Sequence, residues 1–340
     1  MNKRLLFFLC NITLFSGACD RSQNTLSQES NSNIFIDQKP PLAIGCFSDA
    51  NKALQCDALS MQSFRDGDFF CLCDGHCGAD VSNYVARHLP SEFAAGLLCY
   101  NDKKSAFEYA FARVENYALE CLSGGACVGA VYVERKSKIA HIAWTGHVRC
   151  IVQQSGKTSY ATPDHVPHEK KEMARIAETG GVIFREKTQD GSRCGDWRIN
   201  SLNASRAIGN RWAKGKGEGK SEVSGARRVE MPGKLMYELL SQPCNEFQSV
   251  EVQPLDGQII AVPEYEQRQL TLTSRFLLLV TNSFCKVVSN DQAMQFVQEQ
   301  ANKTATLQGI AQLLVAAAVG QRGEGNISAL LVDLLSDYDQ

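Results

Sequence analysis

Residues 69–78, FFCLCDGHCG, form an apolar run that breaks into an Asp-Gly-His turn. Residues 69–73 are typical of a buried strand, because the run is short, continuous and rich in aromatic side chains. Asp74 follows at the strand end, and Gly75 allows another group to approach its backbone closely. A carboxylate in this position is a common ligand for a hard cation. An Asp-Gly pair after a strand is also a common turn, so the segment alone leaves both interpretations open.

The composition is that of an ordinary globular protein. The chain has 340 residues, of which 44% are hydrophobic and 21% are charged. A formal net charge of −2 provides no electrostatic footprint for nucleic acid, and the basic, Gly-rich residues 211–220 are typical of a solvated loop. We therefore expect no nucleic-acid partner.

The N-terminal residues resemble an export signal. Two basic residues precede an apolar run at residues 5–15, and small residues follow it. The run is shorter than the roughly 20 residues that a membrane-spanning helix needs. Cleavage of residues 1–18 would leave Cys19 first, where a lipoprotein carries its lipid, although Ser16 stands where lipoprotein signals usually have Leu. The sequence therefore predicts export, either as a secreted protein or as a lipoprotein tethered to a membrane.

The folded domain is expected to begin after a flexible segment. Residues 19–41 are dominated by Ser, Asn, Gln and Pro and have no apolar period, which predicts a disordered tether. Residues 42–336 contain no linker and no repeat, which predicts a single domain.

Fourteen cysteines occur in the chain, and their scatter lacks the tight spacing of a disulfide scaffold. Cys71, Cys73 and Cys127 lie within apolar runs, where a thiol behaves as a small hydrophobic side chain. We expect most of the cysteines to lie in the core. This expectation also fits a protein that ends in a reducing compartment such as the cytosol of another cell, so a host-directed role stays open.

Apolar runs rich in β-branched and aromatic residues predict the strands, and stretches of helical spacing predict the helices. The expected strands are residues 69–73, 126–133, 139–144, 149–152, 276–280 and 327–334. The expected helices are residues 79–89, 104–122, 170–179, 233–240 and 290–318. Because strands follow one another through residues 126–152 with short turns, the order favours antiparallel sheets and an α+β fold.

Seven motifs, in order over residues 43–334, resemble those of the PPM family, the metal-dependent 2C-type serine/threonine protein phosphatases. DGHCG at residues 74–78 resembles DGHGG, SGGACVGAVYV at 123–133 resembles the SGSTA strand, and AWTGHVRCIV at 143–152 resembles the ANxGDSR strand. The others are TPDHVPHEKKEMARIAETGG at 162–181 for TxDHxP…E…RI…GG, LNASRAIGN at 202–210 for LxxSRAxGD, FLLLVTNSFCKVVSN at 276–290 for FLxLxTDGxxDxxS, and RGEGNISALLV at 322–332 for GSxDNxSxxxV.

The resemblance implies two antiparallel β-sheets packed face to face with α-helices outside, a four-layer αββα sandwich. It also implies a binuclear Mg²⁺ or Mn²⁺ site at one edge, where a metal-bridging water attacks the phosphorus of phosphoserine or phosphothreonine. Two dications about 4 Å apart repel each other by roughly 16 kcal/mol at an effective dielectric constant of about 20. Carboxylates must therefore hold them together.

The site residues implied by the resemblance begin with the opening motif. Asp74 corresponds to the bridging aspartate, and Gly75 to the glycine whose carbonyl faces a metal ion. His76 corresponds to the histidine that acts as general acid, although a histidine here could serve only to cap the turn.

A second group of site residues is implied upstream, where NKALQCDAL at 51–59 resembles R-x-x-N-E-D. Asp57 then corresponds to an aspartate that supports the metal site, and Cys56 stands at a metal-facing glutamate. Lys52 stands at a phosphate-binding arginine. It could attract phosphate as a point charge, or it could be an exposed loop lysine.

Four acidic, metal-facing positions of the family hold other residues in this chain, namely Cys56, His147, Asn282 and Gly325. Asn282 could coordinate through its carbonyl oxygen but brings no charge, and Gly325 brings no side chain. We therefore expect a degenerate phosphatase, a pseudophosphatase that acts by binding a protein, which could be phosphorylated on Ser or Thr.

Two alternatives to this degenerate site stay open. A weakly active Mn²⁺- or Mg²⁺-dependent phosphatase could use Asp57, Asp74, Asn282 and waters. Alternatively, Cys56, His76, Cys77 and His147 beside Asp74 could form a set that suits Zn²⁺.

Overall fold

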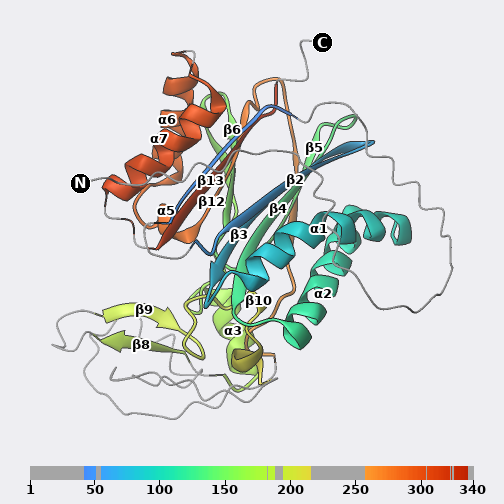
Figure 1. The fold of residues 1–340 in the computed structure, drawn as a ribbon, viewed down its shortest axis with the longest axis vertical. Coiled ribbons are helices and arrows are strands. Elements are labelled where there is room, and N and C mark those ends of the chain that lie inside the picture. The colour runs from blue at the N-terminus through green and yellow to red at the C-terminus, as the bar shows by residue number, and fades with distance from the viewer. Residues whose placement is uncertain are drawn as a thin grey trace, which may run out of the picture.

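The computed structural model describes residues 42–50, 55–181, 183–187, 194–215, 257–303, 305–321, 323 and 325–335. Two antiparallel sheets pack face to face, and helices cover the outer face of each sheet (Figure 1). The predicted α+β fold is therefore confirmed. The predicted export signal at 1–18, the tether at 19–41 and the helix at 233–240 lie outside the described residues.

The strands form two main sheets in which neighbouring strands are antiparallel. The first sheet has the order β1 (Ile44–Ala50), β13 (Asn326–Asp333), β12 (Phe276–Val280), β6 (Arg149–Gln154) and β7 (Lys157–Ala161). The second sheet has the order β11 (Glu264–Gln269), β5 (Ile139–Thr145), β4 (Gly125–Glu134), β3 (Gly67–His76) and β2 (Ala58–Phe64), and the short β10 (Ile208–Gly209) pairs with β4.

Each sheet carries its own pair of helices (Figure 1). The second sheet packs against α1 (Asp80–Cys99) and α2 (Lys103–Cys121), and the first packs against α6 (Asn290–Ala301) and α7 (Leu307–Gly320). The short α5 (Asn282–Cys285) follows β12 directly. None of the helices that the structure describes is both long enough and apolar enough to cross a membrane.

A smaller apolar cluster lies at one end of the sandwich. It combines α3, the hairpin of β8 and β9, and the 3-10 helix η1. Their bounds are α3 (Lys170–Glu178), β8 (Phe184–Lys187), β9 (Cys194–Arg198) and η1 (Arg211–Lys214).

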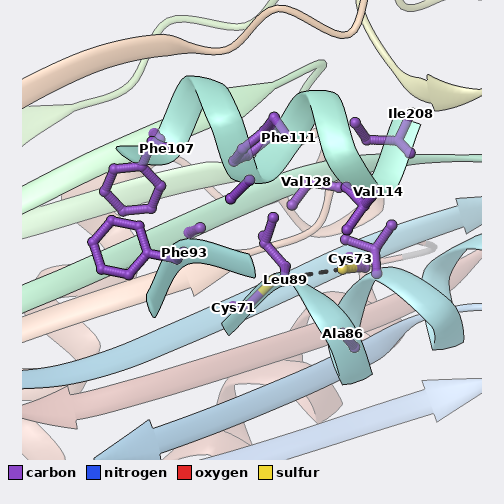
Figure 2. Packing of buried hydrophobic residues seen from close by; sticks show 14 of the residues in the cluster. Cys71, Cys73, Ala86, Leu89, Phe93, Phe107, Phe111, Val114, Val128 and Ile208 are labelled. Atoms are coloured by element: carbon purple, nitrogen blue, oxygen red, sulfur yellow. Dashed lines mark hydrogen bonds between the residues drawn. The ribbon is translucent and has the colours of Figure 1, made fainter. Parts of the chain in front are cut away.

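Strand β3 is buried on both faces, which explains its continuous apolar sequence. Phe69, Cys71 and Cys73 pack beneath α1 and α2, and Figure 2 shows the two thiols together, with their Sγ atoms 3.6 Å apart. Phe70 and Leu72 face the opposite way, into the layer between the sheets. A shift of the strand by one residue would exchange these two sets, so the register of β3 is strongly specified.

The cysteines divide evenly between the core and more accessible positions. Of the ten whose burial the structure describes, five are buried and five are partly or fully exposed. The buried ones are Cys46, Cys71, Cys73, Cys127 and Cys150. The prediction that apolar runs bury their thiols is confirmed, but the prediction that most cysteines lie in the core holds for only half of this group.

Two helix predictions differ from the structure, one in its end and one in its continuity. The helix predicted at 79–89 continues through Pro90 to Cys99, because Phe93 is part of the core face and Gly96 lies close to α2. The single helix predicted at 290–318 is two helices, because Thr306 accepts a hydrogen bond from the Gly309 N–H and starts α7 there.

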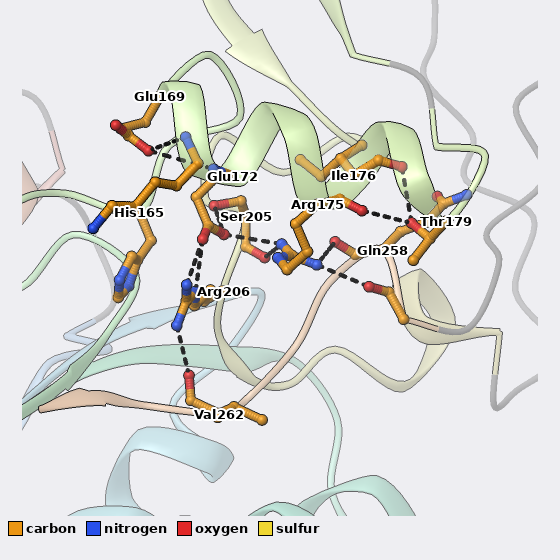
Figure 3. Close-up of polar contacts among 12 residues, drawn as sticks. His165, Glu169, Glu172, Arg175, Ile176, Thr179, Ser205, Arg206, Gln258 and Val262 are labelled. Atoms are coloured by element: carbon orange, nitrogen blue, oxygen red, sulfur yellow. Dashed lines mark hydrogen bonds and ion pairs between the residues drawn. The ribbon is translucent and has the colours of Figure 1, made fainter. Parts of the chain in front are cut away.

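A buried carboxylate on α3 fastens the smaller cluster to the sandwich (Figure 3). Glu172 Oε1 accepts hydrogen bonds from Arg206 Nε and Nη2 at 2.9 and 2.5 Å. Glu172 Oε2 accepts hydrogen bonds from Ser205 Oγ at 2.7 Å and Arg175 Nη2 at 2.9 Å. Arg206 also donates to the carbonyl oxygen of Val262 at 3.2 Å. The network therefore fixes the segment that leads into β10.

The Glu172 network predicts acid sensitivity. Burial raises the pKa of Glu172, but the hydrogen bonds and charge of Arg206 and the charge of Arg175 outweigh it and lower this pKa to about 2. A carboxyl with a depressed folded-state pKa stabilises the protein above its unfolded pKa of about 4.3 and loses this contribution as the pH falls. The free energy of unfolding should therefore decrease between pH of about 4.5 and about 2.

Urea unfolding followed by circular dichroism at a series of pH values measures this effect. Glu172→Gln should flatten the acid dependence and cost about 3–5 kcal/mol at neutral pH, because the buried Arg206 and the partly exposed Arg175 lose the charge that both of them contact. Glu266→Gln, which alters an exposed ion pair with Arg268, is the control and should leave the profile unchanged. Parallel profiles for wild type and Glu172→Gln would contradict this role of Glu172.

The contact of β1 with α7 predicts a second stability effect. A Cβ atom on Gly45 would lie 2.1 Å from the carbonyl oxygen of Leu307, so Gly45→Ala should lower the free energy of unfolding by at least about 1–3 kcal/mol. Gly320, the last residue of α7, has no described heavy atom within 4 Å of its Cβ position. Gly320→Ala should therefore be neutral or stabilising by up to about 1 kcal/mol. Equal effects in thermal unfolding would contradict this close approach.

Candidate active site

The ends of β3 and β12 bring Asp74 and Asn282 together, although the two strands belong to different sheets. Asp74 Oδ2 accepts a hydrogen bond from the backbone N–H of Asn282 at 3.1 Å. Asn282 is the first residue of α5, which follows β12 after Thr281. The candidate site therefore lies at the edge where the two sheets meet.

Asp57 joins the site from the segment before β2. It is buried, and its Oδ2 accepts a 2.6 Å hydrogen bond from Ser328 Oγ on β13. Burial and the charge of Asp74 raise the pKa of Asp57 to about 8, against hydrogen bonds from Ser328 and the Gly75 N–H that favour the ionised form. The two carboxyl groups therefore lie close enough for the charge of Asp74 to disfavour ionisation of Asp57.

The backbone of Cys56 lies beside Gly75. A Cβ atom on Gly75 would be 2.1 Å from the Cys56 carbonyl oxygen, and Ser82 Oγ donates a hydrogen bond to the same oxygen at 2.5 Å. Glycine is therefore required at position 75 by packing alone. Lys52, the predicted phosphate-binding residue, lies outside the described residues.

His76 ends β3 and contacts a residue far away in sequence. Its Nε2 lies 2.9 Å from Asn210 Oδ1. Asn210 has a φ of +57°, in the left-handed region that asparagine tolerates better than most residues, and its N–H donates to the Gly124 carbonyl. Burial lowers the pKa of His76, although Asn210 and Asp74 act in the opposite direction. The imidazole is therefore held in a fixed orientation and is mainly neutral at pH 7.

His147 is buried between three polar groups. Its Nε2 lies 3.4 Å from Asn203 Oδ1 and 3.8 Å from Cys127 Sγ, and its Nδ1 lies 3.9 Å from Asp74 Oδ2. Burial disfavours the imidazolium form, but Cys127 and Asp74 outweigh it and raise the pKa of His147. A basic residue, His147, therefore stands at a position where the resemblance implies a carboxylate.

A cleft of about 300 Å³ opens beside this group. Eight described residues line it: His147, Val166, His168, Asp196, Trp197, Asn203, Asn282 and Lys286. Lys286 Nζ forms an ion pair with Asp196 Oδ2 at 2.7 Å, which joins the end of α5 to β9 across the cleft.

Gly325 lies close to the same edge, next to the residue that follows Asn282. Its φ is +87°, and a Cβ atom on it would be 3.0 Å from Ser283 Oγ. An L-residue here would be strained by its backbone conformation. The structure thus brings this predicted position near the site, but in a conformation suited to glycine.

The proposed zinc set is dispersed among different partners. His76 pairs with Asn210, His147 lies by Asn203, and Cys77 is exposed. Across the described part of the chain, no group of three or more His, Cys, Asp or Glu side chains is arranged to hold a metal ion.

Four residues of the site were not identified from the sequence, namely Cys127, Asn203, Asn210 and Lys286. A signal for Lys286 exists, because the match to F-L-x-L-x-T-D-G-x-x-D-x-x-S places it at the second aspartate. Asn210 likewise stands at the final aspartate of L-x-x-S-R-A-x-G-D. The contacts of Cys127 and Asn203 with His147 join residues far apart in sequence, and no local pattern predicts them.

Comparisons with known proteins identify the family of the chain. A family profile described as "Protein phosphatase 2C" matches residues 47–327. The chain is 22% identical over 275 residues to "Probable protein phosphatase 2C 7" of Oryza sativa subsp. japonica, covering 79% of this chain and 58% of that protein. It is 25% identical over 276 residues to "Protein phosphatase 1F" of Homo sapiens, covering 78% and 49%. The chain thus spans about half to three fifths of the length of these relatives.

Solved structures share the fold. A serine-threonine phosphatase 2C from Toxoplasma gondii superposes with a TM-score of 0.58 at 17% identity, covering 86% of this chain and 95% of that one. A C. elegans sex determining protein superposes with a TM-score of 0.65 at 17% identity, covering 88% and 66%. The profile covers most of the chain and the two-sheet fold agrees with it, so the chain belongs to the protein phosphatase 2C family.

Proposed function

We propose that this phosphatase 2C-like domain acts by binding a protein rather than by metal-dependent hydrolysis. Its relatives belong to a family that generally depends on Mn²⁺ or Mg²⁺. The observation that carries the proposal is the set of side chains around Asp74. The positions that the resemblance assigns to acidic ligands hold Cys56, His147, Asn282 and Gly325.

The charges at this site support the proposal. A pair of dications needs several carboxylates nearby to offset their mutual repulsion. Asp74 and Asp57 supply two, and the four positions named above supply none. The ammonium group of Lys286 lines the adjoining cleft. These residues do not fit a binuclear Mg²⁺ or Mn²⁺ centre.

The alternative is a weak phosphatase that uses a reduced metal site. Asp57 and Asp74 are close enough for the charge of one to raise the pKa of the other, and Asn282 is in contact with Asp74. A cation between the two carboxylates would displace the proton from Asp57. This arrangement would leave one cation, held by fewer charges than the family uses.

Phosphopeptide turnover separates the two functions. The full chain, assayed with a phosphoserine peptide in excess Mn²⁺, should release phosphate no faster than the Asp74→Ala variant. The physical reason is that the bridging water needs two cations to become a nucleophile at neutral pH. Mn²⁺-dependent turnover that disappears in Asp74→Ala would overturn the proposal and support the weak phosphatase.

Restoring the missing ligands tests the charge argument. Cys56→Glu, Asn282→Asp and Gly325→Asp together should not restore Mn²⁺ binding, because His147 and Lys286 remain beside the site. Adding His147→Asp and Lys286→Asp should restore binding, measured by calorimetric titration. The matched control is the same fivefold variant with Gly325→Asn in place of Gly325→Asp. It has similar backbone strain and one carboxylate fewer. Equal Mn²⁺ affinity in the threefold and fivefold variants would show that the two basic residues do not matter.

A further inference from the structure

The cleft beside Asp74 is lined mainly by groups that can donate hydrogen bonds. Of its eight described lining residues, one has an ammonium group, two have imidazoles, two have primary amides and one, Asp196, has a carboxylate. The remaining two are Val166 and Trp197. Such a lining suits an anion better than a cation.

The motif matches show how unusual this lining is for the fold. His147 stands at the aspartate of G-D-S-R, and Asn282 and Lys286 stand at the two aspartates of T-D-G-x-x-D. Three carboxylates have thus been exchanged for side chains that carry N–H groups, and one of these, Lys286, carries a full positive charge. All three line the same cleft.

The carboxylate of Asp196 already occupies two hydrogen-bond donors in the lining of the cleft. Asp196 Oδ2 accepts a hydrogen bond from Asn203 Nδ2 at 3.5 Å and pairs with Lys286 Nζ at 2.7 Å. Two donors from different segments therefore converge on one carboxylate oxygen. The side chains of Lys286 and Asp196 are 48% and 50% exposed, so this pair contributes little stability and can be exchanged.

His147 supplies a further polar atom in the lining of the cleft. Its side chain is 8% exposed, and its Nδ1 lies 3.9 Å from Asp74 Oδ2 and has no hydrogen-bond partner among the described residues. A buried polar atom without a partner is costly, and a ligand that supplies an acceptor would remove that cost. The free volume of about 300 Å³ lies at the lower end of the range for ligand pockets.

We propose that this cleft binds a phosphate monoester directly, without metal ions, with Lys286 and Asn203 as the principal donors and Asp196 as the group that the phosphate displaces. The inference rests on the proposed binding function and names its ligand as a phosphoserine or phosphothreonine segment. A phosphate dianion carries more charge than the Asp196 carboxylate and offers more acceptor oxygens, so it competes well for the same donors. Trp197, which stacks near His168, supplies an aromatic surface for the residues beside the phosphate.

Calorimetric titration of the full chain in excess EDTA tests the proposal. The probes are a phosphoserine peptide, the same peptide without phosphate, and inorganic phosphate. We expect the phosphopeptide to bind, the unmodified peptide to bind at least about tenfold more weakly, and inorganic phosphate to compete with the phosphopeptide. Equal binding of the two peptides, no binding of the phosphopeptide, or binding of inorganic phosphate alone would overturn it.

Two variants should move the affinity in opposite directions. Lys286→Met should weaken phosphopeptide binding by about tenfold or more, since a charged hydrogen bond is lost. Asp196→Asn should tighten it by about twofold to fivefold, since the competing carboxylate is removed. The controls are Lys104→Met on the surface of α2 and Glu266→Gln on β11, which alter exposed ion pairs elsewhere and should leave the affinity unchanged. An unchanged or weakened affinity in Asp196→Asn, with folding intact by circular dichroism, would overturn the displacement.

The outcomes separate this inference from the function on which it rests. Mn²⁺-dependent turnover together with Lys286-dependent binding in EDTA would overturn the non-catalytic function and support the anion site. Absence of both turnover and phosphopeptide binding would leave the non-catalytic function standing and overturn the anion site.

Discussion

Strands β3 and β12 are each buried on both faces, and the position of the site follows from that constraint. On β12, Phe276 and Leu278 pack beneath the helices, while Leu277 and Leu279 enter the layer between the sheets. Each such side chain contributes roughly 1.5–3 kcal/mol through burial, so a shift in register would expose several at once. The strand ends are thereby fixed, and the hydrogen bond from the Asn282 N–H to Asp74 joins the two sheets there. The packing of these two strands therefore sets the shape of the edge at which the candidate site lies.

Two ion pairs in the structure illustrate how burial decides the role of a charge. Glu172 and Arg206 are almost fully buried, and every oxygen of the carboxylate has a donor, so the pair can only hold α3 and the segment before β10 in place. Lys286 and Asp196 form an equally direct contact, but about half of each side chain faces solvent. The first pair is part of the scaffold. The second lines a cleft that a ligand can reach.

The sequence predicts the strands best where burial on both faces produces a continuous apolar run. The core strands β3, β4 and β12 are continuous apolar runs, and they were predicted within a few residues. The edge strands β7 and β11, with the sequences KTSYA and EYEQRQ, face partly to solvent and carry no comparable pattern. Helix α1 passes through Pro90 because packing of Phe93 outweighs the local preference to stop. Motif matching located Asp74, Asn282 and Gly325 near one edge. It could not foresee that Lys286 meets Asp196 or that His76 meets Asn210, because those contacts depend on the whole fold.

The conformation of Gly325 has a consequence for how this edge of the site could evolve. The backbone at this position has a φ of +87°, which strains any L-residue, so an aspartate that arose here would meet this strain before it could contribute a ligand. Selection for stability would therefore act against such a change when it arose alone.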